Sequence, residues 1–233
     1  MLSQDRRVPP RDAQDPALPP PENRMNRKSA PFRIASLCAA AALLAGAAQA
    51  APVVYRIDPS HTYPSFEADH MGISLWRGKF NRNSGSVTLD KAAGTGSVDI
   101  TIDATSIDFG HDGMNEHANA PDYFDTAKYP TATYTGKLVD FVDGKPTRVD
   151  GTLTLRGVSK PVELKILSFK CIQHPRHKRE VCGADALGTL QRDAFGIEAG
   201  KAWGFDMTVT LRIQVEALAE PEAEAATTST KAE

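Results

Sequence analysis

The 233-residue sequence contains only 3 cysteines and 2 tryptophans, and its formal net charge is only -2. A charge so close to zero indicates that nucleic acid is not a partner, because binding to phosphate groups requires an excess of Lys and Arg. The one basic cluster, at residues 176–179, is local. We therefore expect a partner that is not recognised through charge.

Motifs of the common enzyme classes are also missing. The sequence has no Gly-x-Ser-x-Gly nucleophile elbow, no phosphate-binding loop and no dinucleotide fingerprint. In the alternating segment 65–70, Glu67 and Asp69 fall on the face opposite His70, so they do not form an acid/base set with it. We predict a binding protein that has no catalytic residues and needs no cofactor.

The apolar run at residues 34–48 is too short for a comfortable membrane-spanning helix. It follows the basic residues Arg27 and Lys28, and the small-x-small sequence Ala-Gln-Ala follows it, ending at Ala50. This order is typical of a secretory signal peptide. We predict a signal peptide over residues 25–50, cleaved near Ala50, and therefore export.

The two ends of the chain lack the pattern of a folded domain. Residues 1–24 are rich in Pro, Arg and Asp without an apolar period, which predicts a disordered or mis-annotated extension. Met25, at the start of the predicted signal peptide, is then an alternative start of translation. Residues 220–233 predict a disordered tail. One domain, over residues 51–219, remains between them.

Export determines how the cysteines are interpreted. Removal of the signal peptide takes Cys38 with it and leaves Cys171 and Cys182, and two cysteines in an oxidising compartment predict one disulfide. The polar residues between them predict the tip of a hairpin. Closing a loop of this size stabilises the fold by about 3 kcal/mol in the chain-entropy model.

A metal site is the competing interpretation of these residues. His174 and His177 lie between the same cysteines, and a second group contains His111, Glu116 and His117. Structural zinc sites usually contain tightly spaced pairs such as Cys-x-x-Cys, and oxidised cysteines cannot bind a metal. We therefore expect no metal.

Strand patterns fill the predicted domain. From Trp203 to Val215 every second residue is apolar and the residues between are small or polar, which predicts a strand with one buried face in an antiparallel sheet. Similar alternation recurs in residues 53–58, 65–70, 76–89 (with a kink at 81–85), 98–104, 132–138, 149–155, 162–166 and 186–192.

The single break in this pattern is at residues 110–128, where 115–120 predict a short helix. Asp143-Gly144 is a strong hairpin signal. About eight strands with one helical connection predict an all-β fold, either a closed antiparallel barrel or a two-sheet sandwich. A barrel of this size is either just filled by its own side chains or holds one small ligand.

Several short motifs together resemble the YceI-like family, which are lipocalin-shaped proteins often called polyisoprenoid-binding. They occur in the family's order over nearly the whole predicted domain. The motifs are Asp58-Pro59-Ser60-His61-Thr62, His70-Met71-Gly72-Ile73, Arg77-Gly78-Lys79-Phe80, Ser106-Ile107-Asp108, Pro121-Asp122-Tyr123-Phe124-Asp125, Lys128-Tyr129-Pro130, Gly151-Thr152-Leu153-Thr154-Leu155-Arg156-Gly157-Val158 and Arg192-Asp193-Ala194-Phe195-Gly196.

The resemblance implies an eight-stranded lipocalin-like barrel, usually periplasmic, that binds a long apolar chain such as a polyprenyl or quinone tail. We accordingly expect a carrier of an isoprenoid, quinone or fatty-acyl ligand, with transient contact with the inner membrane. The identity of the lipid, its delivery partner and a homodimeric state stay open. The alternative is a structural or stress-response barrel that is filled by its own side chains.

From the inward-facing positions of the predicted strands and from this resemblance, we predict which residues line the ligand site. They are Phe66, Ala68, His70, Phe80, Ile100, Ile102, Phe124, Tyr134, Leu153, Phe205 and Met207.

Individual positions carry further expectations. The small inward residues Ala68, Ala104, Gly136 and Gly151 are expected to leave space for a ligand. His70 is interpreted as a core histidine bonded to a neighbour or as a contact for the ligand's head group. His61, which follows a turn, is expected to lock that turn.

Overall fold

The structure, a computed structural model, describes residues 51–221. The predicted N-terminal extension, the predicted signal peptide and residues 222–233 of the predicted tail lie outside the described residues. Between residues 51 and 221, no helix combines the length and the apolar composition needed to cross a bilayer.

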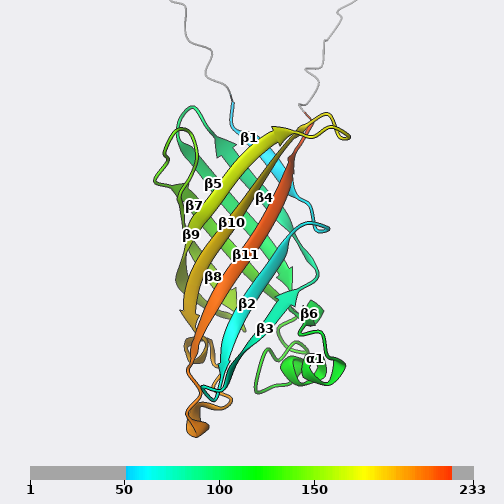
Figure 1. Cartoon of the computed structure of the whole chain (residues 1–233), viewed down its shortest axis with the longest axis vertical. Helices are drawn as coiled ribbons and strands as arrows, with labels where there is room; N and C mark the ends of the chain where they lie inside the picture. The colour runs from blue at the N-terminus through cyan, green and yellow to red at the C-terminus, as the bar shows by residue number, and fades with distance from the viewer. Residues whose placement is uncertain (1–50, 222–233) are drawn as a thin grey trace, which may run out of the picture. The chain divides into compact units, whose positions relative to one another are not determined.

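The domain is one closed antiparallel sheet (Figure 1). The order of its strands is β1-β4-β5-β7-β8-β9-β10-β11-β2-β3-β6, and β1 also pairs with β11, which closes the barrel. The strands are β1 (Val53–Ile57), β2 (Tyr63–His70), β3 (Ser74–Phe80), β4 (Asn83–Asp90), β5 (Thr95–Asp103), β6 (Ile107–Asp108), β7 (Thr131–Val139), β8 (Arg148–Leu155), β9 (Val158–Gln173), β10 (Glu180–Gln191) and β11 (Thr208–Ala219).

Three strands of the barrel are each interrupted and consist of two segments, so the eleven segments form eight strands. β11 pairs with both β1 and β2, which are therefore two halves of one strand. In the same way, β3 and β4 form one strand, because β3 pairs with β2 and β4 pairs with β1. The segments β5 and β6 form another, because β6 pairs with β3 and β5 pairs with β4. Counted this way, the barrel has eight antiparallel strands, which confirms the predicted fold class.

The predicted helical connection is confirmed as well. Helix α1 (Asp112–Asn119) lies between β6 and β7, near the end of β3 (Figure 1). The Nδ1 atom of His111 accepts a hydrogen bond from the amide of Met114 at 3.3 Å, which caps the N-terminus of the helix. His111 thus has a capping role in the fold.

The strand predicted from Trp203 to Val215 begins later than the alternation suggests. β11 starts at Thr208, and Lys201–Trp203 forms a short 3₁₀ helix instead. Gly200 and Gly204 flank this helix with φ values of 81° and 82°, a left-handed conformation that interrupts an extended chain. The alternation of apolar residues therefore extends into a loop that is not a strand. The predicted strand was wrong for residues 203–207.

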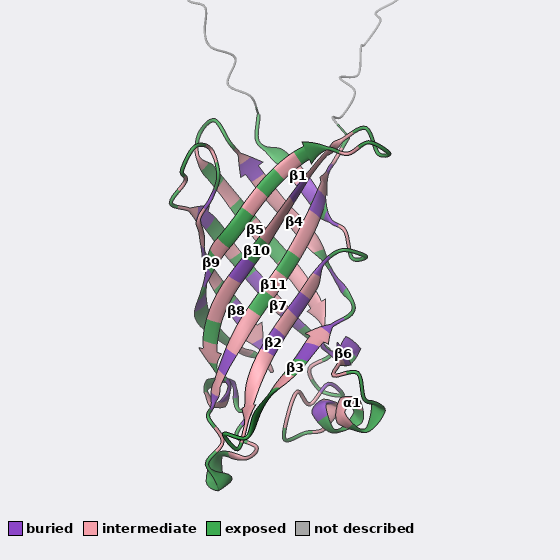
Figure 2. Ribbon diagram, in the orientation of Figure 1, coloured by how far each residue is buried: buried purple, intermediate pink, exposed green. Residues whose placement is uncertain are grey.

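The half of the barrel that carries the β9–β10 hairpin is filled by its own side chains. Tyr55 is 1% exposed and packs in a cluster that includes Leu89, Leu138 and Val149. Figure 2 shows buried residues at intervals along the strands. The Tyr55 hydroxyl donates to Glu180 at 2.5 Å, and burial together with this carboxylate raises the pKa of Tyr55. This half of the interior has the packed core that the alternative interpretation expected for the whole barrel.

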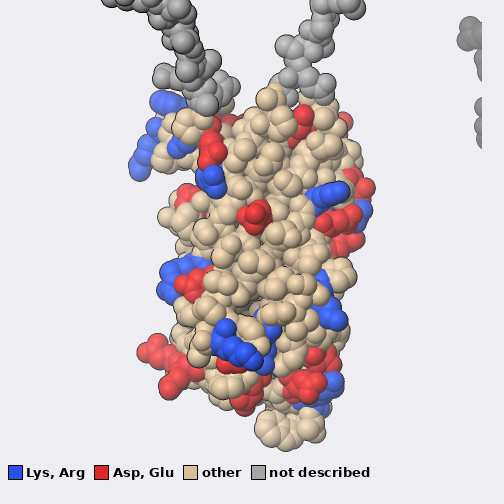
Figure 3. Space-filling view, turned by 180° about the vertical axis from the view of Figure 1, so that it is seen from behind, with Lys and Arg blue, Asp and Glu red and all other residues tan. Residues whose placement is uncertain are grey.

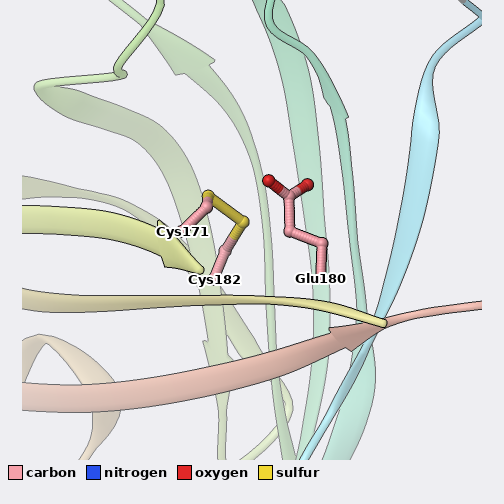
Figure 4. Close-up of side chains that lie close together, drawn as sticks. All are labelled: Cys171, Glu180 and Cys182. Carbon is pink, nitrogen blue, oxygen red and sulfur yellow. A yellow bond between two sulfur atoms is a disulfide. The ribbon is translucent and has the colours of Figure 1, made fainter. Parts of the chain in front are cut away.

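The predicted disulfide lies at the same end. Cys171 in β9 is directly opposite Cys182 in β10, and their sulfur atoms are bonded (Figure 4). With Glu180, they form the one group of potential metal ligands found within residues 51–221. Because both sulfurs are in the disulfide, this group does not fit a zinc ion.

Candidate ligand-binding cavity

The other half of the barrel encloses a cavity of about 380 Å³. Its wall is mostly aliphatic and aromatic, and it reaches from Leu164 in the barrel wall to Trp203 in the loop before β11. Its volume falls within the usual range for small-molecule sites, which is about 300–1,000 Å³. The interior is therefore packed in one half and hollow in the other.

Ten of the eleven predicted ligand-lining residues lie in the cavity wall. They are Phe66, Ala68, His70, Phe80, Ile100, Ile102, Phe124, Tyr134, Leu153 and Phe205. Whether they contact a ligand stays a prediction. Met207 is buried but does not line the cavity, because residues 204–207 precede the strand and strand parity does not orient them.

Aromatic rings form the wall next to α1. Phe66 lies at the centre, with its ring centroid 5.9 Å from Phe80, 5.6 Å from Phe109 and 6.4 Å from Phe124. Gly78 makes room for this cluster, since a Cβ atom there would lie 2.6 Å from the Phe66 ring. Phe109 was missed because it lies in the connection after β6, where no alternation marks inward positions.

The small inward residues do not all serve the cavity. Ala68 lines it, but Ala104, Gly136 and Gly151 do not. Gly151 instead accommodates the ring of Tyr134, whose hydroxyl donates to the carbonyl of Val162 at 2.9 Å. The expectation that small residues leave space for a ligand was therefore wrong at these three positions.

His70 is held by aromatic contacts. Its ring stacks on Trp76 with centroids 4.1 Å apart and an interplanar angle of 13°, and it meets Phe205 edge-on at 5.3 Å. No hydrogen bond to its imidazole is found within residues 51–221, so the bonded neighbour that the first interpretation of His70 requires is not seen there. His70 itself lines the cavity.

Two charged residues in the cavity wall were not predicted. Arg192 is 8% exposed and donates to the carbonyls of Ala199 at 2.7 Å and Ile197 at 3.4 Å. Burial lowers the pKa of its guanidinium group. The other is Asp69, and both sit at ends of strands, where periodicity no longer indicates the buried face.

His61 has the structural role that its position predicted. Its Nδ1 atom lies 2.8 Å from Oδ2 of Asp58, and the other carboxylate oxygen of Asp58 accepts from the amide of Ser60 at 2.8 Å. The hydrogen bond to Asp58 raises the pKa of His61. His61 locks the turn between β1 and β2 and does not line the cavity.

A closed eight-stranded antiparallel barrel with an apolar cavity is the architecture of the small β-barrels whose interior can hold one small ligand. Comparison with known sequences gives the family. The YceI-like domain profile matches residues 55–217, and the chain belongs to the YceI-like family.

Two relatives illustrate the similarity in sequence. Protein YceI of Escherichia coli O6:H1 is 38% identical over 128 residues, which cover 54% of this chain and 66% of the relative. UPF0312 protein VPA0850 of Vibrio parahaemolyticus is 37% identical over 120 residues, which cover 51% of this chain and 63% of the relative. The chain thus spans a little under two thirds of the length of these relatives.

Solved structures share the fold. The Campylobacter jejuni YceI protein matches with a TM-score of 0.55 and 26% identity over 66% of this chain and 90% of its own. Burkholderia cenocepacia BcnA matches with a TM-score of 0.55 and 22% identity over 69% of this chain and 99% of its own. A polyisoprenoid-binding domain from Saccharophagus degradans matches with a TM-score of 0.51 and 23% identity over 71% of this chain and 98% of its own.

Proposed function

We propose that the protein is an exported, periplasmic carrier that holds one long apolar molecule in the hollow half of its barrel. The ligand class is an isoprenoid, a quinone with its tail or a fatty-acyl lipid. The observation that carries this proposal is the cavity of about 380 Å³ with its almost entirely apolar wall. An engineered apolar cavity of about 150 Å³ stays dry and binds benzene, so a larger one is suited to a longer hydrocarbon.

The wall can supply the binding energy without a charged head-group site. Each buried CH₂ group contributes about 0.8 kcal/mol, so ten of them contribute roughly 8 kcal/mol before ordering costs. That total corresponds to about a micromolar dissociation constant. The polar groups of Arg192 and His70 in the same wall are suited to orient an oxygen-bearing head group.

The proposed export and the proposed ligand class are supported by different observations. The sequence pattern at residues 25–50 and the disulfide between Cys171 and Cys182 favour an oxidising compartment outside the cytoplasm. Binding of a polyisoprenoid is named for the Saccharophagus degradans domain, which shares this fold. We propose binding without catalysis, together with transient contact with the inner membrane.

Organic extraction of the purified protein tests the proposal. Mass spectrometry of the extract is expected to find about one long-chain lipid per protein molecule. A control extraction of the same protein after denaturation and washing on a hydrophobic resin, followed by refolding, is expected to yield none, and added lipid is expected to restore the signal. An empty native protein that takes up no prenyl, quinone or fatty-acyl lipid would instead support the structural role.

A further inference from the structure

Four large apolar side chains stand exposed on two segments that are far apart in the chain but contact each other in the fold. Met71, Ile73 and Leu75 lie at or beside the turn between β2 and β3 and are 52%, 77% and 51% exposed. Trp203, in the loop between β10 and β11, is 76% exposed. We call these four residues the apolar rim. Among the described large hydrophobic residues, Ile73 and Trp203 are the two most exposed.

The rim borders the open end of the cavity. Trp203 itself lines the cavity, as do His70 and Trp76, which flank the β2–β3 turn. In Figure 1 this turn, the loop before β11 and α1 gather at the lower end of the barrel, opposite the β9–β10 hairpin. Figure 3 shows an uncharged knob projecting at the same end. A ligand that enters or leaves at this end passes the rim.

The two segments of the rim are joined before any partner binds. One oxygen of Asp69 accepts from the amide of Gly72 in the β2–β3 turn at 2.8 Å, and the other accepts from the amide of Asp206 in the loop before β11 at 3.1 Å. The ring of His70 bridges the same segments by contacting Trp76 and Phe205. The exposed apolar groups are thus held together, and docking requires little additional ordering.

We propose that the apolar rim docks onto a lipid bilayer and places the mouth of the cavity at the bilayer surface. This inference rests on the proposed function, because a long apolar ligand resides in a bilayer before and after it is carried. Tryptophan prefers the interface between bilayer and water, where its ring is buried and its N–H stays hydrated. Ile73, Met71 and Leu75 supply the aliphatic groups that enter the acyl region.

The charges around the mouth of the cavity indicate which kind of bilayer surface the rim binds. In residues 69–77, 108–128 and 192–206, which surround the mouth, Asp and Glu outnumber Lys and Arg. The basic residues Arg176 and Lys178 lie on the β9–β10 hairpin at the opposite end. An anionic bilayer surface therefore repels this end of the barrel. We infer that the rim binds a zwitterionic phospholipid surface. Binding at the rim is apolar and insensitive to salt.

Vesicle flotation of the full-length chain tests this inference. The probe is phosphatidylcholine vesicles, and the variant is Ile73→Ser combined with Trp203→Ser. The matched control combines Val142→Ser with Leu167→Ser, two apolar residues of 59% and 57% exposure away from the rim. The rim variant is expected to bind at least about tenfold more weakly than the control, because each lost side chain removes apolar burial.

A second measurement tests whether Trp203 itself contacts the bilayer. Spin-labelled phosphatidylcholine is expected to quench tryptophan fluorescence in the wild-type protein, and Trp203→Phe is expected to remove most of that quenching. Circular dichroism of each variant confirms that it is folded.

Three outcomes would overturn the docking proposal: equal binding of the rim and control variants, binding that needs phosphatidylglycerol and disappears at high salt, or a rim variant that changes only the oligomeric state. Lipid extraction from the same preparations separates this test from that of the proposed function. A lipid-loaded protein with rim-independent binding refutes docking alone, whereas an empty protein with rim-dependent binding refutes the carrier function alone.

Discussion

The ring of Tyr134 extends over Gly151 of the neighbouring strand, and a Cβ atom at Gly151 would be only 2.2 Å from its Cζ and hydroxyl atoms. The ring reaches Val162 on the next strand, where its hydroxyl donates to the carbonyl oxygen at 2.9 Å. One glycine thus allows a tyrosine to connect three strands of the wall.

Gly151→Ala is therefore expected to destabilise the barrel. The added methyl group displaces Tyr134 and weakens its hydrogen bond to Val162, and overpacking of this kind costs about 1–3 kcal/mol. Urea denaturation followed by circular dichroism measures the change. Gly183→Ala in β10 is the matched control, because its new Cβ would have its nearest neighbours at 3.5 Å. Equal stability of the two variants would contradict this role for Gly151.

The same pair shows how far sequence predicts this fold. Alternation gave the strands and the inward parity of Tyr134 and Gly151, because side chains of a strand point to alternating faces. It could not show that the tyrosine occupies the space left by the glycine, since this depends on the register between β7 and β8. The alternation along one strand identifies its buried face. The register between neighbouring strands determines which part of that face is filled by side chains.

Short-range turn chemistry was predictable for a different reason. Asp143 and Gly144 have φ values of 49° and 70°, the left-handed conformations that this dipeptide adopts in a hairpin, and the bridge between Val142 and Lys145 confirms the turn. Cys171 and Cys182 were likewise predicted as a pair and are bonded. The turn follows from a local dipeptide, whereas the disulfide follows from export, because only two cysteines remain after the signal peptide is removed.

The mouth of the cavity was the least predictable part. Phe109, Arg192 and Asp69 lie in connections or at ends of strands, where no period indicates which side chains are buried. Their positions depend on contacts between distant segments, such as the bond from the amide of Asp206 to Asp69. Sequence patterns therefore described the wall of the barrel better than its open end.

Reduction of the disulfide is expected to lower stability moderately. Cys171 and Cys182 are separated by 11 residues, and in the chain-entropy model a loop of this size contributes about 3 kcal/mol. Urea denaturation with and without dithiothreitol measures the difference. A variant with both cysteines replaced by Ala is the control and is expected to be insensitive to dithiothreitol. A wild-type midpoint unchanged by reduction would show that the hairpin hydrogen bonds alone order this end.

The turn lock between Asp58 and His61 is expected to make stability depend on pH. The hydrogen bond and charge of Asp58 raise the pKa of His61, so this contribution is fully present below the ordinary histidine value of 6.5 and is lost as pH rises through the raised pKa. Burial opposes the shift of Asp58, but the bond to His61 and the amide of Ser60 lower its pKa overall. Its contribution is lost as pH falls through that lowered value.

NMR titration of the His61 ring measures this directly. Its pKa is expected to lie above 6.5 in the wild-type protein and to return towards that value in Asp58→Asn. The stability difference between the two proteins is expected to shrink as pH rises from about 6 to about 9, because His61 becomes neutral. A His61 pKa that Asp58→Asn leaves unchanged would contradict the lock.

Arg192 is expected to hold the loop at the mouth through its two carbonyl contacts. Arg192→Met keeps much of the apolar volume but leaves the carbonyls of Ile197 and Ala199 without this donor, which costs about 1–3 kcal/mol. Hydrogen exchange of residues 193–206 is expected to become faster, whereas exchange in β9 and β10 near the disulfide stays unchanged. Exchange that accelerates uniformly would indicate global destabilisation instead of a local role.

Ala68 is the small residue that does line the cavity, and Ala68→Leu is therefore expected to reduce ligand occupancy. The added atoms occupy space that the ligand needs, and strain of about 1–3 kcal/mol weakens binding by about 5- to 150-fold. Ala92→Leu adds the same atoms at an exposed site between β4 and β5 and is expected to bind as the wild type does. Lipid per protein, measured after extraction, compares the two. If both variants fold and carry equal amounts of lipid, the ligand does not occupy the cavity beside Ala68, because a filled volume cannot accept three more carbon atoms without loss.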